Sequence, residues 1–343
     1  MIVRSKSPLR LGLAGGGTDI SAYSDLYGGA VLNATIDMFS YCTIETIDEN
    51  NSLKFISLDL DKKITLDSLS FIELNGDLIL HKAIYNRVVQ DFNNGKSLSI
   101  CVTTYSDAPP GSGLGSSSTM IVTMLAAYRK LLVFRLNKHD LAHLAYKIER
   151  HDCNMSGGKQ DQYAATFGGF NFIEFFNNDK VVVDSLKIRS SVVNELEYRT
   201  MLFFTGISRD SSKIINEQIQ AVRSSKESSS LQSMHKVKEL SFKTKETLLR
   251  EDVDSLIDNF SKSWLEKKKM SSSITNKYID DLTEILFCNG VEALKISGAG
   301  GGGFMLLFID PAKRYEIISL LKPYDGYVQS FHFYEKGVEA WIV

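Results

Sequence analysis

The stretch PPGSGLGSSST, Pro109–Thr119, is the most informative segment of this sequence. It lies between a run typical of a strand, Ser97–Thr104, and a long apolar run typical of a helix, Ser118–Leu132. Because glycine has no Cβ, the alternating glycines let backbone N–H groups approach an anion closely. The N-terminus of the following helix directs its dipole and its unpaired N–H groups at the same place. The stretch therefore predicts a phosphate-binding loop between a strand and a helix.

Two other glycine motifs bind phosphate, and the sequence fits neither. A P-loop requires GxxxxGK followed by Ser or Thr. Gly95–Lys96 lacks the upstream glycine, and Gly158–Lys159 lacks the following hydroxyl. A GxGxxG match begins at Gly298, but the letters FMLLFI that follow predict a strand, whereas the dinucleotide fingerprint opens a helix.

The length and composition limit which kinds of protein this chain can be. At 343 residues the chain favours two domains, and a hydrophobic fraction of 43% is sufficient for ordinary cores. The net charge of −2 provides no basic surface for nucleic acid or an anionic membrane. The four cysteines are scattered without metal or disulfide spacing, and no apolar run approaches the roughly 20 residues of a membrane helix. We therefore expect a cytoplasmic protein with neither nucleic acid nor membrane as a partner.

Two further glycine-rich islands flank the loop, at Gly12–Gly17 and Gly298–Gly303. Hydrophobic periodicity around the islands predicts strands over Ala30–Ile47, Leu53–Leu58, Gly169–Phe176, Val291–Ser297, Gly303–Ile309 and Gly326–Tyr334, and helices over Leu80–Phe92, Asp140–Arg150 and Pro311–Leu321. Asn137, three residues before Asp140, resembles a capping box. The segment Ser208–Cys288 reads as helical, with an exposed turn at Ser224–Ser233.

The strands and helices after Cys288 predict an antiparallel sheet in an α+β domain. The domain boundary is expected between Asp179 and Tyr198, which divides the chain into residues 1–185 and 186–343.

The three islands resemble, in order, the three motifs of the GHMP kinases, a family that includes galactokinase, homoserine kinase and mevalonate kinase. They read SPLRLGLAGGGTD (Ser7–Asp19), PPGSGLGSSST and KISGAGGGGF (Lys295–Phe304). The resemblance spans nearly the whole chain. It implies a two-domain α+β fold, with an N-terminal domain like domain 2 of ribosomal protein S5 and a ferredoxin-like C-terminal domain. It also implies an active site in the cleft between them, with ATP and Mg²⁺ as cofactors.

The resemblance assigns roles to single residues. Asp161, in GKQDQ, matches the family's catalytic aspartate, and Arg10 matches the cation beside it. Such a carboxylate accepts the proton of the acceptor hydroxyl, and the cation keeps it ionised. Ser117 and Glu149 match the Mg²⁺ ligands, and a hydroxyl with one carboxylate suits an ion that retains several waters. The residues expected to hold ATP are Pro110, Gly111, Ser112, Gly113, Leu114, Gly115, Ser116, Ser117 and Ser118.

The first island departs from galactokinase-like members, which carry Glu-His where this chain has Gly16–Gly17 before Thr18 and Asp19. The missing side chains leave room and free backbone N–H groups where the terminal carbons of a sugar would lie. Asp19 can still accept hydrogen bonds from sugar hydroxyls. AGGGTD is similar to the branch of the family that contains kinases of L-fucose and of D-glycero-D-manno-heptose 7-phosphate.

From this branch we expect the heptose 7-phosphate as acceptor, phosphorylated in the synthesis of GDP-heptose for surface polysaccharide. Lys159 is the candidate partner for the phosphate that this sugar carries, with Lys82 and Arg87 as weaker candidates. Further residues expected at the acceptor are Gly16, Gly17, Thr18, Gly298, Gly300 and Gly301.

Several alternatives stay open on the sequence alone. One is a different acceptor, such as L-fucose, another hexose or a non-sugar alcohol. A second is a non-catalytic nucleotide-binding regulator of the same fold, against which the intact Arg10, Ser117, Glu149 and Asp161 argue. A third is a decarboxylase, since the family includes an ATP-dependent one, but the GGGTD element points away from it. The expected partners are a sugar phosphate and ATP, and both a monomer and a homodimer are compatible with the sequence.

Overall fold

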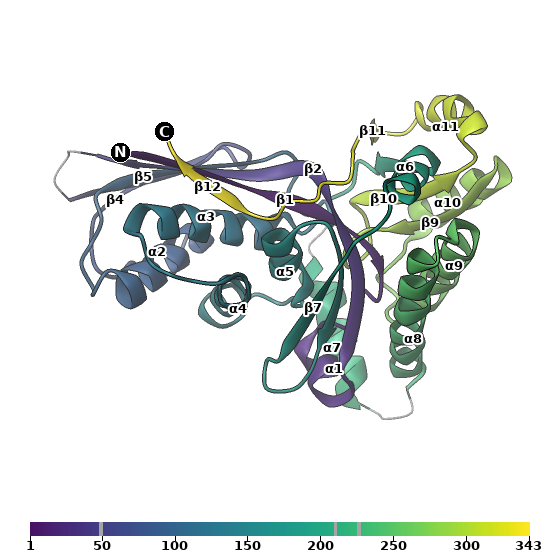
Figure 1. Cartoon of the computed structure of the whole chain (residues 1–343), viewed down its shortest axis with the longest axis horizontal. Helices are drawn as coiled ribbons and strands as arrows, with labels where there is room; N and C mark the ends of the chain where they lie inside the picture. Colours follow the sequence, from purple (N-terminus) through teal and green to yellow (C-terminus); the bar gives the residue numbers. More distant parts are fainter. Residues whose placement is uncertain (48–50, 209–210, 225–227) are drawn as a thin grey trace.

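The fold is given by a computed structural model that describes residues 1–47, 51–208, 211–224 and 228–343 (Figure 1). Within this part of the chain, eight strands form one mixed sheet, ordered β12-β1-β2-β5-β3-β4, with β6 and β7 continuing from β2. They are β1 (Ile2–Ala14), β2 (Gly29–Thr46), β3 (Ser52–Ser57), β4 (Lys62–Asp67), β5 (Ile100–Ser106), β6 (Phe170–Phe175), β7 (Val181–Leu186) and β12 (Glu339–Ile342).

The long strand β2 organises this sheet. Its second half, from Ser40, pairs with β5, and its first half, up to Ala34, pairs with β6. Helices α2 and α3 share one apolar core with the strands β2, β3 and β5. The helices in this half are α1 (Ser21–Tyr27), α2 (Ile79–Phe92), α3 (Ser116–Leu132), α4 (Lys138–Lys147), the π-helix η1 (Ile148–Asp152) and α5 (Gln160–Phe167).

The second sheet is antiparallel, in the order β11-β8-β10-β9. Its strands are β8 (Thr200–Phe204), β9 (Val291–Ile296), β10 (Phe304–Ile309) and β11 (Tyr327–Gln329). Its helices are α6 (Ser190–Arg199), α7 (Ser211–Ser224), α8 (Ser229–Leu249), α9 (Val253–Lys268), α10 (Lys277–Cys288), the short 3₁₀-helix η2 (Pro311–Lys313) and α11 (Arg314–Leu321). Helical crossovers after β8 and β10 complete the ferredoxin-like order expected from the family resemblance.

A shared core joins the two sheets. Leu9 and Leu11 of β1 belong to the same buried cluster as Phe304 and Leu306 of β10. The alternate residues of β10, such as Met305, face a second cluster with the helices on the other side. Both faces of this strand are therefore buried, which explains why FMLLFI is apolar without alternation. The shared core fixes the two halves of the molecule against each other.

The predicted elements are confirmed, with shifted ends, except near the C-terminus. The strand expected over Gly326–Tyr334 forms only at β11. Strands β1, β4, β7, β8 and β12 were not predicted. β12 pairs with β1, with Lys6 opposite Glu339, and Figure 1 shows the two termini side by side. The last residues therefore belong to the first sheet. The expected division into residues 1–185 and 186–343 assigns this strand to the C-terminal part.

The remaining local predictions concern a cap and a turn. The Asn137 side chain accepts a hydrogen bond from the Asp140 N–H, as the capping-box pattern predicts. The exposed turn expected over Ser224–Ser233 is shorter than predicted, because residues 229–233 already form the start of α8, with Leu231 and Ser233 buried. Residues 225–227 of this segment lie outside the described residues. None of the described helices combines the length and hydrophobicity that a bilayer span requires.

Candidate active site

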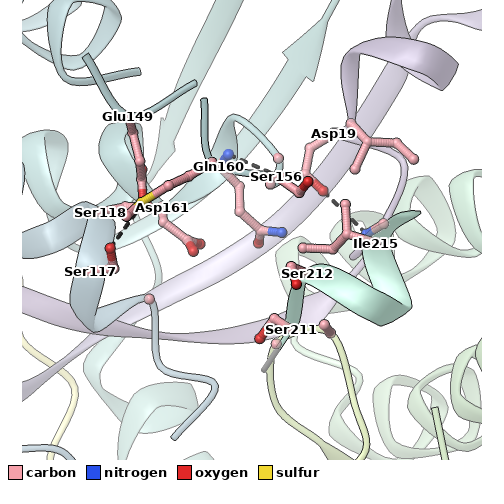
Figure 2. A pocket seen from close by; sticks show the side chains of 18 of the residues that line it. Asp19, Ser117, Ser118, Glu149, Ser156, Gln160, Asp161, Ser211, Ser212 and Ile215 are labelled. Atoms are coloured by element: carbon pink, nitrogen blue, oxygen red, sulfur yellow. Dashed lines mark hydrogen bonds between the residues drawn. The ribbon is translucent and has the colours of Figure 1, made fainter. Parts of the chain in front are cut away.

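A cavity of about 730 Å³ is lined by residues from both halves of the chain. All three glycine islands reach it: Gly17 and Asp19 from the first, Gly113 from the second and Gly298 from the third. Figure 2 shows Ser117, Ser118, Glu149 and Asp161 gathered in one part of the cavity. Asp19, Ser156 and the first residues of α7 lie in another part. The fold thus assembles one site from segments that are far apart in the sequence.

The phosphate loop leads directly into α3, as predicted. Gly111, Gly113 and Gly115 have positive φ angles of 71°, 83° and 77°, and all three line the cavity. The next residues of the lining are Ser116, Ser117 and Ser118, the first turn of α3. A helix of 17 residues thus points its N-terminal N–H groups into the cavity.

Three members of the predicted ATP-binding set have side chains directed elsewhere. Ser112 and Leu114 are fully buried beneath the loop. The carbonyl of Ser112 accepts a hydrogen bond from the Phe304 N–H, which ties the loop to β10. Pro110 is absent from the described lining, and its carbonyl accepts a hydrogen bond from the Ser208 hydroxyl. The expectation that these residues hold ATP through the backbone of the loop stays a prediction.

Glu149 is held at the start of α3. Ser117 Oγ donates to Glu149 Oε1 at 3.0 Å, and Ser118 Oγ donates to Oε2 at 2.6 Å. Gln162 Nε2, from α5, donates to the same Oε2 at 2.7 Å. Glu149 lies in the π-helix η1, a widened turn of the kind often found at functional sites. Its side chain is 3% exposed, and these contacts offset the cost of burying the charge.

These oxygens fit a magnesium ion. The cavity-lining hydroxyl of Ser117 and the Glu149 carboxylate are hard oxygen donors, and they lie beside the helix start expected to bind phosphate. No cluster of three or more His, Cys, Asp or Glu side chains suited to a metal occurs among the described residues. A donor set with a single carboxylate agrees with Mg²⁺ held jointly by protein, substrate phosphates and water.

Asp161 and Arg10 form a close ion pair in the cavity. Arg10 Nε and Nη2 both lie 2.7 Å from Asp161 Oδ1. Arg10 is 3% exposed and also donates through Nη1 to the Gly113 carbonyl at 2.7 Å. Gly115 allows Asp161 to approach the phosphate loop, because a Cβ there would lie 2.9 Å from the Asp161 Cγ. The predicted base and cation are thus brought together beside the loop.

Asp19 lies in another part of the cavity, where its carboxylate caps α5. Its Oδ1 accepts the Gly17 N–H and its Oδ2 accepts the Gln160 N–H, each at 3.1 Å. Gly158 makes this approach possible, because a Cβ at that residue would lie 1.9 Å from Asp19 Oδ2. The neighbouring Arg150 donates to the Gly158 carbonyl and so holds the segment in place.

Not all of the residues next to Asp19 that were predicted to contact the substrate line the cavity. Thr18 is buried, with its hydroxyl 2.9 Å from the Gly15 carbonyl and 3.0 Å from that of Ala30. Its predicted substrate contact is therefore wrong. Gly17 lines the cavity, whereas Gly16 is absent from the described lining and lies close to the ammonium of Lys267.

The prediction for Lys159 is also corrected. Its side chain is 2% exposed and does not line the cavity. The ammonium lies 3.0 Å from Asp25 Oδ1 and 3.3 Å from Asp179 Oδ1. The weaker candidates are engaged elsewhere as well: Lys82 donates to the Asn75 carbonyl and Arg87 pairs with Asp152.

Three glycines of the third island were predicted to contact the substrate: Gly298, Gly300 and Gly301. Of these, Gly298 is the one found in the described lining of the cavity. Gly300 packs against Ile274, where a Cβ would lie 2.7 Å from the Ile274 carbonyl oxygen. The N–H of Gly301 donates to that same carbonyl. These two glycines therefore shape the loop and do not face a substrate, which corrects their assignment.

Lys267, at the end of α9, is a cation in the cavity that was not predicted from the sequence. Its side chain is 3% exposed and its ammonium donates to the Gly298 carbonyl. Burial and the nearby Arg10 lower the pKa of Lys267 to about 8, while Asp19 opposes the shift. Lys267 belongs to a run of three lysines that reads as a solvated helix end, so no signal in the sequence distinguished it. Gln218 of α7 and Gln160 also line the cavity and were not predicted.

Comparison with known proteins identifies relatives over the whole chain. The profile "GHMP kinases N terminal domain" matches residues 79–169, and "GHMP kinases C terminal" matches residues 244–323. The D-glycero-alpha-D-manno-heptose 7-phosphate kinase of Campylobacter jejuni is 44% identical over 99% of each chain. The bifunctional fucokinase/GDP-fucose pyrophosphorylase of Arabidopsis thaliana is 26% identical over 90% of this chain and 30% of its own length.

Solved structures agree with the sequence comparison. A protein of Bacteroides thetaiotaomicron described as a D-glycero-D-manno-heptose 1-phosphate kinase is 38% identical and covers 99% of both chains, with a TM-score of 0.84. A galactokinase of Lactococcus lactis superimposes with a TM-score of 0.76 at 17% identity, which supports the fold alone.

Proposed function

The chain belongs to the GHMP kinase family, and from this we propose that it is an ATP-dependent sugar kinase that phosphorylates O1 of D-glycero-α-D-manno-heptose 7-phosphate. The product would be the 1,7-bisphosphate, in the cytoplasmic synthesis of GDP-heptose for surface polysaccharide. The Arg10–Asp161 ion pair beside the phosphate loop, within a cavity lined by all three islands, carries this proposal.

In this reaction the acceptor hydroxyl attacks the γ-phosphorus of ATP, and ADP leaves. We assign Asp161 as the base that takes the proton of that hydroxyl, since its carboxylate is ion-paired in the cavity. Arg10 orients the Asp161 carboxylate and stabilises negative charge on the transferred group. Because Arg10 is also anchored to Gly113, it fixes the base relative to the phosphate loop.

The phosphate loop and the first turn of α3 are proposed to hold the triphosphate, mainly through backbone N–H groups. Ser117 and Glu149 would hold Mg²⁺, which neutralises phosphate charge when bound. Asp19, whose carboxylate is fixed by two N–H groups, would accept hydrogen bonds from the sugar hydroxyls.

L-fucose is the second candidate acceptor, since a fucokinase is among the relatives. A comparison of kcat/KM in an ADP-coupled assay tests the proposal with four acceptors: heptose 7-phosphate, heptose 1-phosphate, free heptose and L-fucose. We expect the highest value for heptose 7-phosphate. The assignment fails if L-fucose is turned over equally well. It also fails if heptose 1-phosphate is preferred, because the acceptor hydroxyl would then be a different one.

A further inference from the structure

The cavity contains three cations in the part of the chain that the structure describes, and one of them has no acidic partner. Arg10 pairs with Asp161, and Arg150 lies 3.3 Å from Glu149. The ammonium of Lys267 forms no ion pair with any described carboxylate, and its hydrogen bond goes to the backbone carbonyl of Gly298. Asp19 is the acidic group that attracts it at longer range, but the Asp19 oxygens already accept two N–H groups.

A buried ammonium without a counter-ion is costly, and this cost falls when an anion binds. Lys267 is 3% exposed, and its pKa is lowered to about 8 because burial and Arg10 disfavour the charged form. Its place in the last turn of α9 favours positive charge only modestly. The environment therefore favours binding of an anionic ligand group at this ammonium.

Two glycines let the first island pack closely against Lys267 and its neighbours. A Cβ at Gly16 would lie 3.6 Å from the Lys267 Nζ. A Cβ at Gly17 would lie 2.6 Å from the Met270 Cε and 3.5 Å from the Gln218 Oε1. Side chains at these two positions would crowd Met270, Gln218 and Lys267, so the glycines bring the first island close to α7 and α9. The open volume beside the lysine is that of the cavity, which Gly17, Gln218 and Lys267 all line.

We propose that Lys267, with Gln218 of the same cavity, binds the phosphate group that the acceptor sugar already carries. This inference rests on the proposed function and replaces Lys159, which faces away from the cavity. Asp161 and Asp19 hold the reacting end and the ring hydroxyls, and Lys267 holds the terminal phosphate. The lysine thus determines specificity for phosphorylated over unphosphorylated heptose.

The decisive variants are Lys267→Met, which removes the charge, and Lys267→Arg, which keeps it. A hydrogen bond to a charged group lost from a buried site corresponds to roughly 10- to 100-fold in binding. We expect Lys267→Met to raise KM for heptose 7-phosphate by about that factor, with kcat and the Kd of ADP within a few-fold of wild type. Lys159→Met is the matched control, since it removes a buried lysine outside the cavity and leaves this KM unchanged.

The pH dependence gives a readout that a purely structural role would not produce. The sugar phosphate is already a dianion above pH 7, because its second pKa is near 6. Lys267 loses its proton as pH rises through about 8, so KM of the wild type rises above that pH. An arginine stays charged, so in Lys267→Arg KM stays flat between pH 8 and 9.5.

Two results overturn the inference. In the first, Lys267→Met lowers kcat and leaves KM for heptose 7-phosphate unchanged, which assigns the lysine to the transferred phosphoryl group. In the second, the KM values of the Met and Arg variants both equal that of the wild type at every pH. A wild-type enzyme that does not turn over heptose 7-phosphate contradicts the proposed function itself, so the two failures are distinguishable.

Discussion

At the scale of single residues, the proposed phosphoryl transfer depends on two charged side chains, Arg10 and Asp161. Arg10 contacts Asp161 Oδ1 through two nitrogens and also contacts the phosphate loop through a third. This geometry fixes the carboxylate beside the place where the γ-phosphoryl group is expected. It also explains Gly115, since any Cβ at that position would collide with Asp161.

Substitution of Asp161 by Asn tests the base. The amide cannot accept the proton, so we expect kcat to fall by about 10²- to 10⁴-fold. The Kd of ADP should stay within a few-fold, because the loop and Glu149 are untouched. Asp25→Asn is the control, since Asp25 pairs with Lys159 outside the cavity and its loss should leave kcat near wild type. Near-normal turnover by Asp161→Asn would remove this residue from the mechanism.

At this scale, the residues that could be predicted from the sequence are those for which the reaction requires a particular side chain. Arg10, Ser117, Glu149 and Asp161 were all expected, and the structure brings them to one cavity. Lys159 was misassigned because spacing along the chain does not determine whether a side chain faces the cavity or the opposite side. Lys267 was missed for a related reason, since only the tertiary fold distinguishes it from its neighbours in the lysine run.

At the scale of elements, α3 and η1 form the proposed metal site together. The first turn of α3 supplies Ser117 and Ser118, and the π-helix places Glu149 against both hydroxyls. In the sequence this segment reads as the end of an ordinary helix, Asp140–Arg150. The π-helix, which depends on packing around the site, could not be inferred from periodicity.

The Mg²⁺ requirement tests this pairing of elements. Glu149→Gln removes the anionic ligand, so we expect the Mg²⁺ concentration for half-maximal rate to rise by roughly tenfold or more. The control is Asp152→Asn, which lies in the same π-helix but pairs with Arg87 and does not line the cavity. An unchanged Mg²⁺ titration in Glu149→Gln would refute the ligand assignment.

Some strands of the two sheets could be predicted from the sequence and others could not. β2, β3, β5, β6, β9 and β10 were recognised because β-branched and apolar runs are bounded by turn residues. β8, with sequence TMLFF, is a short central strand buried along its whole length, and it lacks the alternation that identifies a half-exposed strand. β12 is four residues long and acquires strand structure by pairing with β1.

On the scale of the whole molecule, the active-site proposal depends on the two sheets packing together. β1 extends from the N-terminal sheet, carries Arg10 and contributes Leu9 and Leu11 to the core shared with β10. The third island continues from β9 and places Gly298 against Gly113 of the phosphate loop. The three glycine motifs, in their order along the chain, predicted this assembly. The pairing of the C-terminal strand β12 with β1 is not marked by any motif, so it was not predicted.

The ³¹P NMR time course of wild-type protein with ATP, Mg²⁺ and heptose 7-phosphate shows which hydroxyl, if any, receives the phosphoryl group. We expect the 7-phosphate signal to persist while a second phosphomonoester, coupled to the anomeric proton, grows in step with ADP. Release of ADP with inorganic phosphate and no new sugar ester would contradict this expectation. A new ester coupled to any other proton of the sugar would contradict it as well.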